Sequence, residues 1–203
     1  MITVFTTISV DPNIKSTHYR AYDSDRYLEY EGEVKNPVNA VLAKVLKKDD
    51  KVKIILLADD SKDVEKYIQD YKDELAEINK SIHAQIVYGD PVIEVFQENK
   101  LVQEKRFRKC IDQIEEGTQI ICDITYGQKP MPILQLCVLS FAEKYFNADI
   151  KYVTYGSKFE SGHVENPHIY NVTDLYYLHE LTAAMDAPDG KTALKLVDNY
   201  FAM

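Results

Sequence analysis

The segment CDITYGQKPMP, residues 122–132, places polar side chains between a run of apolar residues and a stretch that favours a helix. Gly127 lets the backbone approach a ligand closely, and the start of the helix offers unpaired N–H groups and the positive end of its dipole. The side chains suited to hydrogen bonding, base stacking or phosphate attraction are Thr125, Tyr126, Gln128 and Lys129. The segment therefore indicates a site for a small anion or a nucleotide. The alternative interpretation is an ordinary polar turn with a surface lysine.

A second polar segment, TISVDPN at residues 7–13, follows the first apolar run of the chain. Parallel strands of an α/β sheet present their ligands at their carboxyl ends, near the point where the strand order reverses. If both apolar runs are strands of one sheet, residues 7–13 and 123–130 lie at the same edge. We expect these two segments to form one site.

Other sequence patterns of catalysis or metal binding are missing. Neither GxGxxG nor GxxxxGK[ST] occurs, which removes the main support for a dinucleotide site or a P-loop. The five histidines form no HExxH, and no GxSxG marks a serine nucleophile. The cysteines form no CxxC, and we expect reduced, buried thiols at Cys110, Cys122 and Cys137. We expect neither a metal nor a cofactor.

The composition is that of a folded acidic protein. The chain has 203 residues, 45% of them hydrophobic, with a formal net charge of -9. That charge argues against binding long nucleic acid through a broad surface, although a local pocket can still hold a small anion. No apolar run approaches the roughly 18 residues of a membrane span, and the N-terminus lacks the pattern of a signal peptide. We expect a cytoplasmic protein without membrane contact.

Strand and helix patterns alternate along the chain. The predicted strands are 2–10, 52–58, 83–89, 118–125, 149–156 and 168–173, the last at an edge. The predicted helices are 37–48, 61–81, 91–117 with a break near Asn99–Lys100, 130–147, 173–187 and 190–203. This alternation predicts an α/β fold of the Rossmann-like, doubly wound type, with a mainly parallel sheet and helices on both faces. Residues 11–36 interrupt the pattern with a polar, Tyr- and Asp-rich insertion, in which YLEYEGEV (27–34) suggests a hairpin strand.

The order of these elements resembles a known family. DITYGQKPMPI (123–133), an apolar helix, KYVTYG (151–156) and HIYNVTDLYYLHELTAAMDA (168–187) follow one another as in the CRISPR-associated Rossmann-fold (CARF) domain. The likeness is greatest to the sensor half of type III CRISPR ancillary effectors. It covers most of the chain and is best over residues 118–187. Tyr126 stands where the family often has histidine, and the insertion at 11–36 has no clear counterpart.

The resemblance implies a homodimer that binds one cyclic oligoadenylate ring across its two-fold axis, with the tetra-adenylate favoured over the hexa-adenylate. It implies that residues 1–187 form the ligand-sensing domain and that 188–203 form a C-terminal helix, a linker to an effector domain. Carried over by position, the implied ligand-binding residues are Ile8, Ser9, Val10, Asp11 and Asn13, and Thr125, Tyr126, Gly127, Gln128 and Lys129.

Two alternatives stay open. The first is a metal-independent ring nuclease that cleaves the bound messenger by attack of a ribose 2′-hydroxyl on the neighbouring phosphate. Lys129 would then stabilise the developing charge, while Thr125 and Ser9 help to position the groups. The second is a transcriptional regulator or a plain interaction domain of the same fold. The C-terminal segment GKTALKLVDNYFAM is too short for a winged helix, which counts against a regulator.

Overall fold

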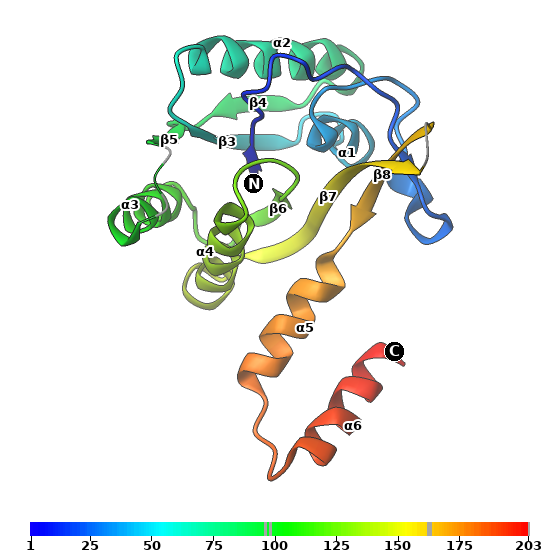
Figure 1. Ribbon diagram of the computed structural model, residues 1–203, viewed down its shortest axis with the longest axis vertical. Coiled ribbons are helices and arrows are strands. Elements are labelled where there is room, and N and C mark those ends of the chain that lie inside the picture. The colour runs from blue at the N-terminus through cyan, green and yellow to red at the C-terminus, as the bar shows by residue number, and fades with distance from the viewer. Residues whose placement is uncertain (96, 98, 162–163, 203) are drawn as a thin grey trace.

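The computed structural model describes residues 1–95, 97, 99–161 and 164–202. Within them, one mostly parallel sheet of eight strands carries helices on both faces (Figure 1), which confirms the predicted Rossmann-like α/β fold. The sheet order is β2-β8-β7-β6-β1-β3-β4, and β5 also pairs with β3. The strands are β1 (Ile2–Thr7), β2 (Arg20–Ala21), β3 (Lys51–Asp59), β4 (Gln85–Tyr88), β5 (Val92–Glu94), β6 (Gln119–Asp123), β7 (Asp149–Ser161) and β8 (Val164–Asn171).

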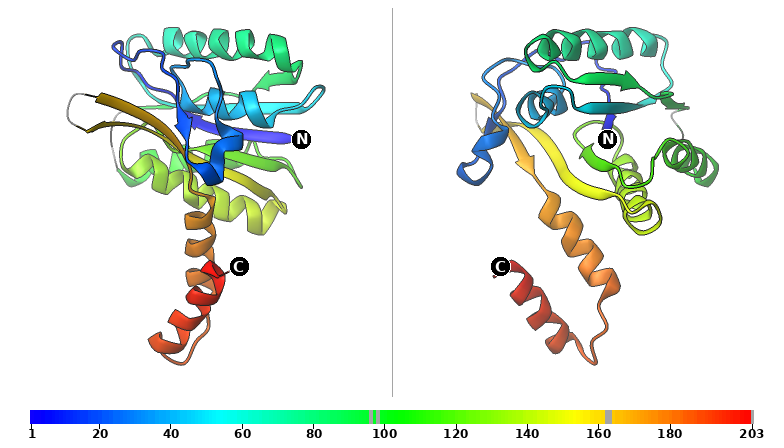
Figure 2. Two further views of the ribbon diagram at one scale, coloured as in Figure 1. Left: turned by 90° about the vertical axis from the view of Figure 1, so that its right-hand side faces the viewer. Right: turned by 180° about the vertical axis from the view of Figure 1, so that it is seen from behind.

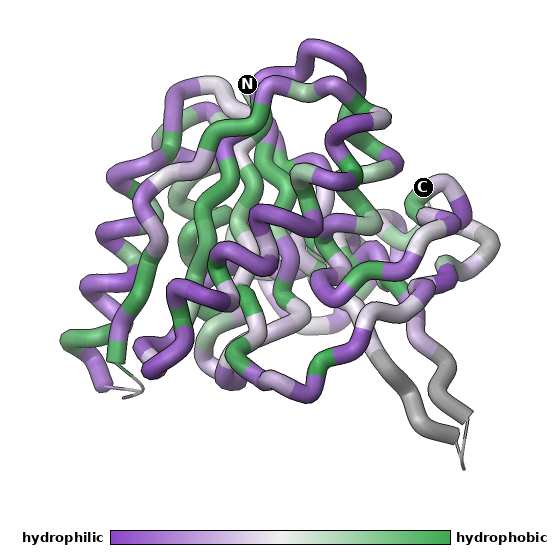
Figure 3. The backbone as a smooth tube through the Cα atoms, turned by 90° about the horizontal axis from the view of Figure 1, so that it is seen from above, coloured by the Kyte–Doolittle hydropathy of each residue, from purple (hydrophilic) through white to green (hydrophobic). Residues whose placement is uncertain are grey.

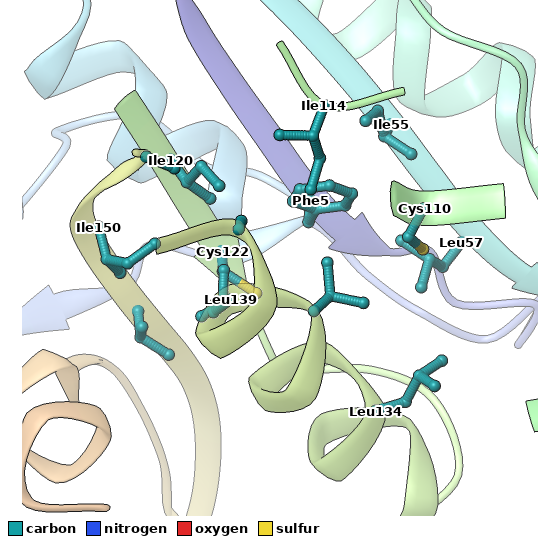
Figure 4. Packing of buried hydrophobic residues seen from close by; sticks show 14 of the residues in the cluster. Phe5, Ile55, Leu57, Cys110, Ile114, Ile120, Cys122, Leu134, Leu139 and Ile150 are labelled. Atoms are coloured by element: carbon teal, nitrogen blue, oxygen red, sulfur yellow. The ribbon is translucent and has the colours of Figure 1, made fainter. Parts of the chain in front are cut away.

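Helices cover both faces because the central strands are apolar on both sides. The helices are α1 (Pro37–Val45), α2 (Val64–Ile82), α3 (Lys100–Ile111), α4 (Pro130–Phe146), α5 (Thr173–Ala184) and α6 (Gly190–Phe201). Helices α1 and α2 pack on one face, and α3 and α4, with Tyr176 of α5, pack on the other (Figure 2). Figure 4 shows the hydrophobic cluster on the face that α3 and α4 cover. In this cluster, Phe5 of β1 lies between residues of β3, α3 and β6. Hydrophobic segments gather along the central strands (Figure 3).

Local signals in the sequence explain several helix ends. Pro37 occupies the first turn of α1, where a missing N–H costs little. The Asn99 side chain accepts a hydrogen bond from the Val102 N–H and caps α3. His83 and Asn147 adopt left-handed conformations, with φ of 63° and 50°, and end α2 and α4.

Three expectations were wrong. Residues 92–94 form strand β5 rather than the start of a long helix, because Val92 is buried beside β3 while β-branched residues follow Pro91. Residues 27–34, all of which the structure describes, do not form the suggested hairpin strand. Asp23–Leu28 form a 3-10 helix, and an isolated bridge joins Thr17 to Val34. The third is Cys137, which is exposed on α4 although the other two cysteines are buried.

Helices α5 and α6 extend away from the sheet (Figure 1). Polar contacts fasten α5 to α4. Tyr176 donates a hydrogen bond of 2.6 Å to Glu143, and the Ser140 hydroxyl donates to Glu180. A hydrogen bond of 3.2 Å from Tyr200 to the Asp174 carbonyl ties α6 back to the start of α5. In the described part of the chain, no helix is both long and apolar enough to span a membrane.

Candidate functional site

The strand order reverses beside β1. This strand pairs with β3 on one side and with β6 on the other, and all three run parallel. The chain moves outward from β1 to β3 and β4, and later returns to β6 and β7 on the opposite side. Loops that leave the carboxyl ends of β1 and β6 diverge at such a switch point and leave a crevice between them. The two segments singled out by sequence, 7–13 and 123–130, are these loops.

Three adjoining hollows occupy this edge of the sheet, and all three share Ser9 and Asp11. The first, of about 320 Å³, lies between the β1 and β6 loops and includes Gly127. The second, of about 360 Å³, extends from Thr125 towards β7. The third, of about 150 Å³, reaches the start of α1 and the side of α2. Ser9 and Asp11 therefore sit at the junction of a single branched crevice.

Hydrogen bonds within the loop that follows β1, residues 8–13, fix its conformation. The Ser9 hydroxyl oxygen accepts a hydrogen bond from the Asp11 N–H at 3.1 Å. The Asp11 carboxylate accepts from the Asn13 N–H at 2.9 Å and from the Asn13 side-chain amide at 3.1 Å. These local bonds are the turns that Ser and Asp favour, and they fix the loop without help from a ligand. These bonds do not use the Ser9 hydroxyl proton or the second carboxylate oxygen of Asp11.

The other residues of this loop differ in how far they reach the crevice. Ile8 lines the first hollow, but it is only 3% exposed and belongs to the core under α1 and α2. Val10 lines the same hollow with a half-buried side chain. The Asn13 amide is committed to Asp11, which makes Asn13 a support of the loop.

Asp123 is the buried polar centre of the site. Its carboxylate, 1% exposed at the end of β6, accepts hydrogen bonds from the Thr6 hydroxyl at 3.0 Å and the Thr125 hydroxyl at 2.5 Å. Burial raises the pKa of Asp123 to about 6, and the two threonine bonds oppose that rise. The Thr125 oxygen in turn accepts from the Gly156 N–H at 2.7 Å. Thr125 thus joins β6 to β7, with its hydroxyl proton and one of its two acceptor lone pairs in use.

Tyr126 joins the β6 loop to the insertion. Its hydroxyl donates a hydrogen bond of 2.7 Å to the Lys35 carbonyl, just before α1. Burial, followed by the neighbouring Tyr19 hydroxyl, raises the pKa of Tyr126 far above its ordinary value, so the phenol stays a neutral donor. The ring still borders the first and second hollows. Tyr126 therefore lines the crevice, and its hydrogen bond to the Lys35 carbonyl holds it in place.

The start of α4 offers fewer N–H donors than the sequence suggests. Pro130 and Pro132 have none, and the Met131 N–H already bonds to the Gln128 carbonyl at 2.8 Å. Among the described residues, the N–H groups of Gly127, Gln128 and Lys129 form no hydrogen bond to the protein. Gly127 has a φ of +99°, and a Cβ there would lie 3.0 Å from Thr7. Only glycine fits this close, left-handed turn.

The cations are arranged differently from the expectation. Lys129 is exposed at the start of α4 but lines none of the three hollows. Lys35 and Lys66 line the third hollow beside Asp11. Sequence reasoning missed both, because Lys35 lies in the unmatched insertion and Lys66 lies in the first turn of α2. Helix α2 follows β3 directly, so its first turn must lie at this edge, and that placement was the available signal.

Asp59 is an acid at the crevice that the sequence analysis did not place in the site. It ends β3, lines the first hollow and forms an ion pair of 2.5 Å with Arg106 of α3. The Arg106 side chain is fully buried and Asp59 is 13% exposed. The buried guanidinium holds the Asp59 carboxylate at the wall of the crevice. Asp59 and Asp11 therefore offer acceptors for hydroxyl or amine donors of a ligand.

The branched crevice thus combines tyrosine walls, lysines in one arm, and acids near the junction. Among the residues that the structure describes, no group of three or more His, Cys, Asp or Glu side chains could hold a metal ion. A scan against protein-family models and a search of curated proteins found no match to this chain.

Proposed function

We propose that this protein is a sensor domain of the CARF type, which binds a cyclic oligoadenylate second messenger in the crevice between the β1 and β6 loops. The tetra-adenylate is the favoured ring. The observation that carries the proposal is the branched crevice at the topological switch point, whose hollows meet at Ser9 and Asp11. The ordered motifs at 123–133, 151–156 and 168–187 support the same family.

The chemistry of the crevice suits a nucleotide ring. Lys35 and Lys66 attract phosphates, and three backbone N–H groups at 127–129 can donate to them. Asp11 and Asp59 accept hydrogen bonds from ribose hydroxyls or adenine amines. A ligand with both charged and hydrogen-bond-donating edges matches this mixture better than a simple anion does.

A surface on α4 supports the proposed homodimer. Ile133, Cys137, Phe141 and Tyr145 follow one another at helical spacing of four residues, and Ile133 and Tyr145 are 65% and 60% exposed. An apolar hollow of about 630 Å³ lies between α3 and α4 and includes Cys137 and Phe141. Two copies meeting along this stripe form an isologous interface, which suits a ligand that has rotational symmetry of its own.

The placement of Thr125 favours binding over cleavage. Ring cleavage needs groups that are free to align a ribose hydroxyl and stabilise charge. The Thr125 hydroxyl already donates to Asp123 and accepts from Gly156. Lys129 lies outside the hollows. We therefore propose that the ring leaves this protein intact.

Calorimetric titration with cyclic tetra-adenylate and cyclic hexa-adenylate tests the proposal. We expect saturable binding of the tetra-adenylate by the wild-type protein. Ser9→Leu, which fills the junction of the hollows, should abolish it, whereas Ser81→Leu on the exposed end of α2 should not. Absence of heat with both rings, on protein shown to be folded, contradicts the proposed function.

A further inference from the structure

Four aromatic side chains form a continuous row at the outer strands of the sheet: Tyr155 of β7, Tyr170 and His168 of β8, and Tyr22, which directly follows β2. Tyr155 of β7 lies directly opposite Tyr170 of β8, and His168 is two residues from Tyr170 on the same face. The ring centroids are 6.2 Å apart for Tyr155 and Tyr170, and 5.6 Å for Tyr170 and Tyr22. Tyr22 stacks on His168 at 4.8 Å with an interplanar angle of 21°. We call these four residues the aromatic row.

The row is joined to the crevice at one end. Tyr155 lines the second hollow together with Ser9, Thr125 and Tyr126. The next residue, Gly156, donates its N–H to the Thr125 hydroxyl, which holds this part of β7 against the β6 loop. A Cβ on Gly156 would lie only 2.4 Å from the Pro37 ring, so the missing side chain permits this close packing. The position of Tyr155 beside the crevice is therefore fixed by the fold.

The row remains open to water although aromatic rings are usually buried. Tyr22 is 55% exposed and Tyr155 is 40% exposed, while His168 is 9% exposed and contacts the rings of Tyr22 and Tyr170. At the outer end, exposed Arg20 of β2 is the register partner of His168. Exposed rings on a sheet face beside a cation are the arrangement on which proteins stack unpaired bases.

We propose that the aromatic row is a stacking surface for the adenine bases of an oligoadenylate bound in the crevice. Tyr155 holds the base nearest the crevice, and Tyr170 and Tyr22 extend the surface outward towards Arg20. The inference rests on the proposed function, because it assigns the base-recognising part of the same ligand site. It gives a role to Tyr22, Tyr155 and Tyr170, which belong to none of the three buried hydrophobic clusters.

Two variants with matched controls test the row. Tyr155→Ala and Tyr170→Ala should each weaken calorimetric binding of cyclic tetra-adenylate by about 5- to 100-fold, the loss expected for one stacked base. Tyr155→Phe keeps the ring and should bind as the wild type does. Tyr27→Ala removes another exposed tyrosine of the insertion, which lines a hollow with Ile2 and Gln119 at the opposite edge of the sheet, and should have no effect. Thermal unfolding of each variant verifies that it is folded.

Proton NMR of the ligand separates stacking from a purely structural role of Tyr155, because only stacking changes the adenine resonances. Stacking on a tyrosine ring shifts adenine proton resonances upfield, and we expect this shift with wild-type protein and Tyr155→Phe but a smaller one with Tyr155→Ala. If the wild type binds the ring and both alanine variants bind it equally well, the aromatic row is overturned while the proposed function stands. If the wild type binds neither cyclic tetra-adenylate nor linear oligoadenylate, both are overturned. Binding of linear oligoadenylate alone, weakened by Tyr155→Ala, supports the row and contradicts the proposed ring ligand.

Discussion

The Tyr126 hydroxyl donates a hydrogen bond of 2.7 Å to the carbonyl oxygen of Lys35, which joins two loops 91 residues apart in the sequence. One partner leaves β6 and the other ends the insertion before α1. This bond closes the crevice on the side of α1, and it places Lys35 beside the hollow that Lys66 and Asp11 also line.

Tyr126→Phe should therefore open this side of the crevice while keeping the ring. We expect a loss of about 1 kcal/mol in the free energy of unfolding, the usual value of one hydrogen bond, measured by urea denaturation. Ligand affinity should also fall, because the two loops are no longer held together. Tyr27→Phe on the 3-10 helix is the control, and a similar loss of ligand affinity in that variant would count against the account of Tyr126.

Glu74 of α2 anchors the same region from the other side. Its carboxylate accepts hydrogen bonds from the Lys35 and Asn36 N–H groups and from the side chains of Asn36 and Asn39, at 2.7–3.2 Å. These groups lie at the start of α1, where an anion is also favoured by the helix dipole. Glu74→Ala should lower the free energy of unfolding by about 2–3 kcal/mol. Glu77→Ala, an exposed residue of the same helix, should change it by less than about 0.5 kcal/mol, and equal losses would contradict the anchoring role.

Asp123 predicts a pH dependence of stability. Its folded-state pKa of about 6 lies above the ordinary value of 3.8, so its stabilising contribution is complete below about pH 4 and is lost as the pH rises through 6. The size of the loss is about 3 kcal/mol, from the shift in pKa. About one third of this loss has occurred by pH 4.5, so urea unfolding of wild type and Asp123→Asn should diverge by about 2 kcal/mol between pH 4.5 and 7.5, in favour of the variant at the higher pH. Asp60→Asn at the same edge is the control, and parallel curves for wild type and Asp123→Asn would contradict the raised pKa.

Lys66 should contribute to phosphate binding. Lys66→Met should weaken cyclic tetra-adenylate binding and lower the slope of log affinity against log salt by about one, because one counterion-releasing contact is lost. Lys62→Met, an exposed lysine just before α2, should leave the slope unchanged. If the affinity of the wild-type protein for cyclic tetra-adenylate does not depend on salt, Lys66 does not contact a phosphate.

The stripe on α4 predicts the assembly. Ile133→Glu should convert the proposed homodimer to a monomer in sedimentation velocity with little change in stability, because Ile133 is 65% exposed. Cys137 is the exposed cysteine, and the other two are buried. A short bismaleimide should therefore cross-link two copies through Cys137, and Cys137→Ser should prevent it. A wild-type protein that sediments as a monomer would contradict the proposed interface.

The fold, and the placement of the two candidate loops at one edge of the sheet, were predictable from the sequence, whereas the contacts of individual side chains were not. Continuous apolar runs such as 52–58 identify parallel strands, and parallel strands place their following loops at one edge. The β5 strand was missed because three residues give too short a pattern to separate from a helix. The sequence also could not reveal that the Thr125 hydroxyl is used by Asp123 and Gly156, since Gly156 is distant in the chain.

The aromatic row illustrates the same limit. Tyr22, Tyr155 and Tyr170 come from three parts of the chain, and only the register of β7 with β8 and the approach of the insertion bring them together. Lys35 and Lys66 likewise become neighbours of Asp11 only through the packing of α1 and α2. Tertiary contacts of this kind leave no periodic signal in a single sequence.

Native mass spectrometry of the protein with cyclic tetra-adenylate tests the central proposal most directly, because it reports ligand, stoichiometry and cleavage together. The account predicts a complex of two chains with one ring, whose mass shows that the ring is intact after prolonged incubation. A mass increase that corresponds to hydrolysis, or released linear products, would move the protein to the ring nucleases. Two chains or one chain without any bound ring, at ligand concentrations well above the protein's, would contradict the account.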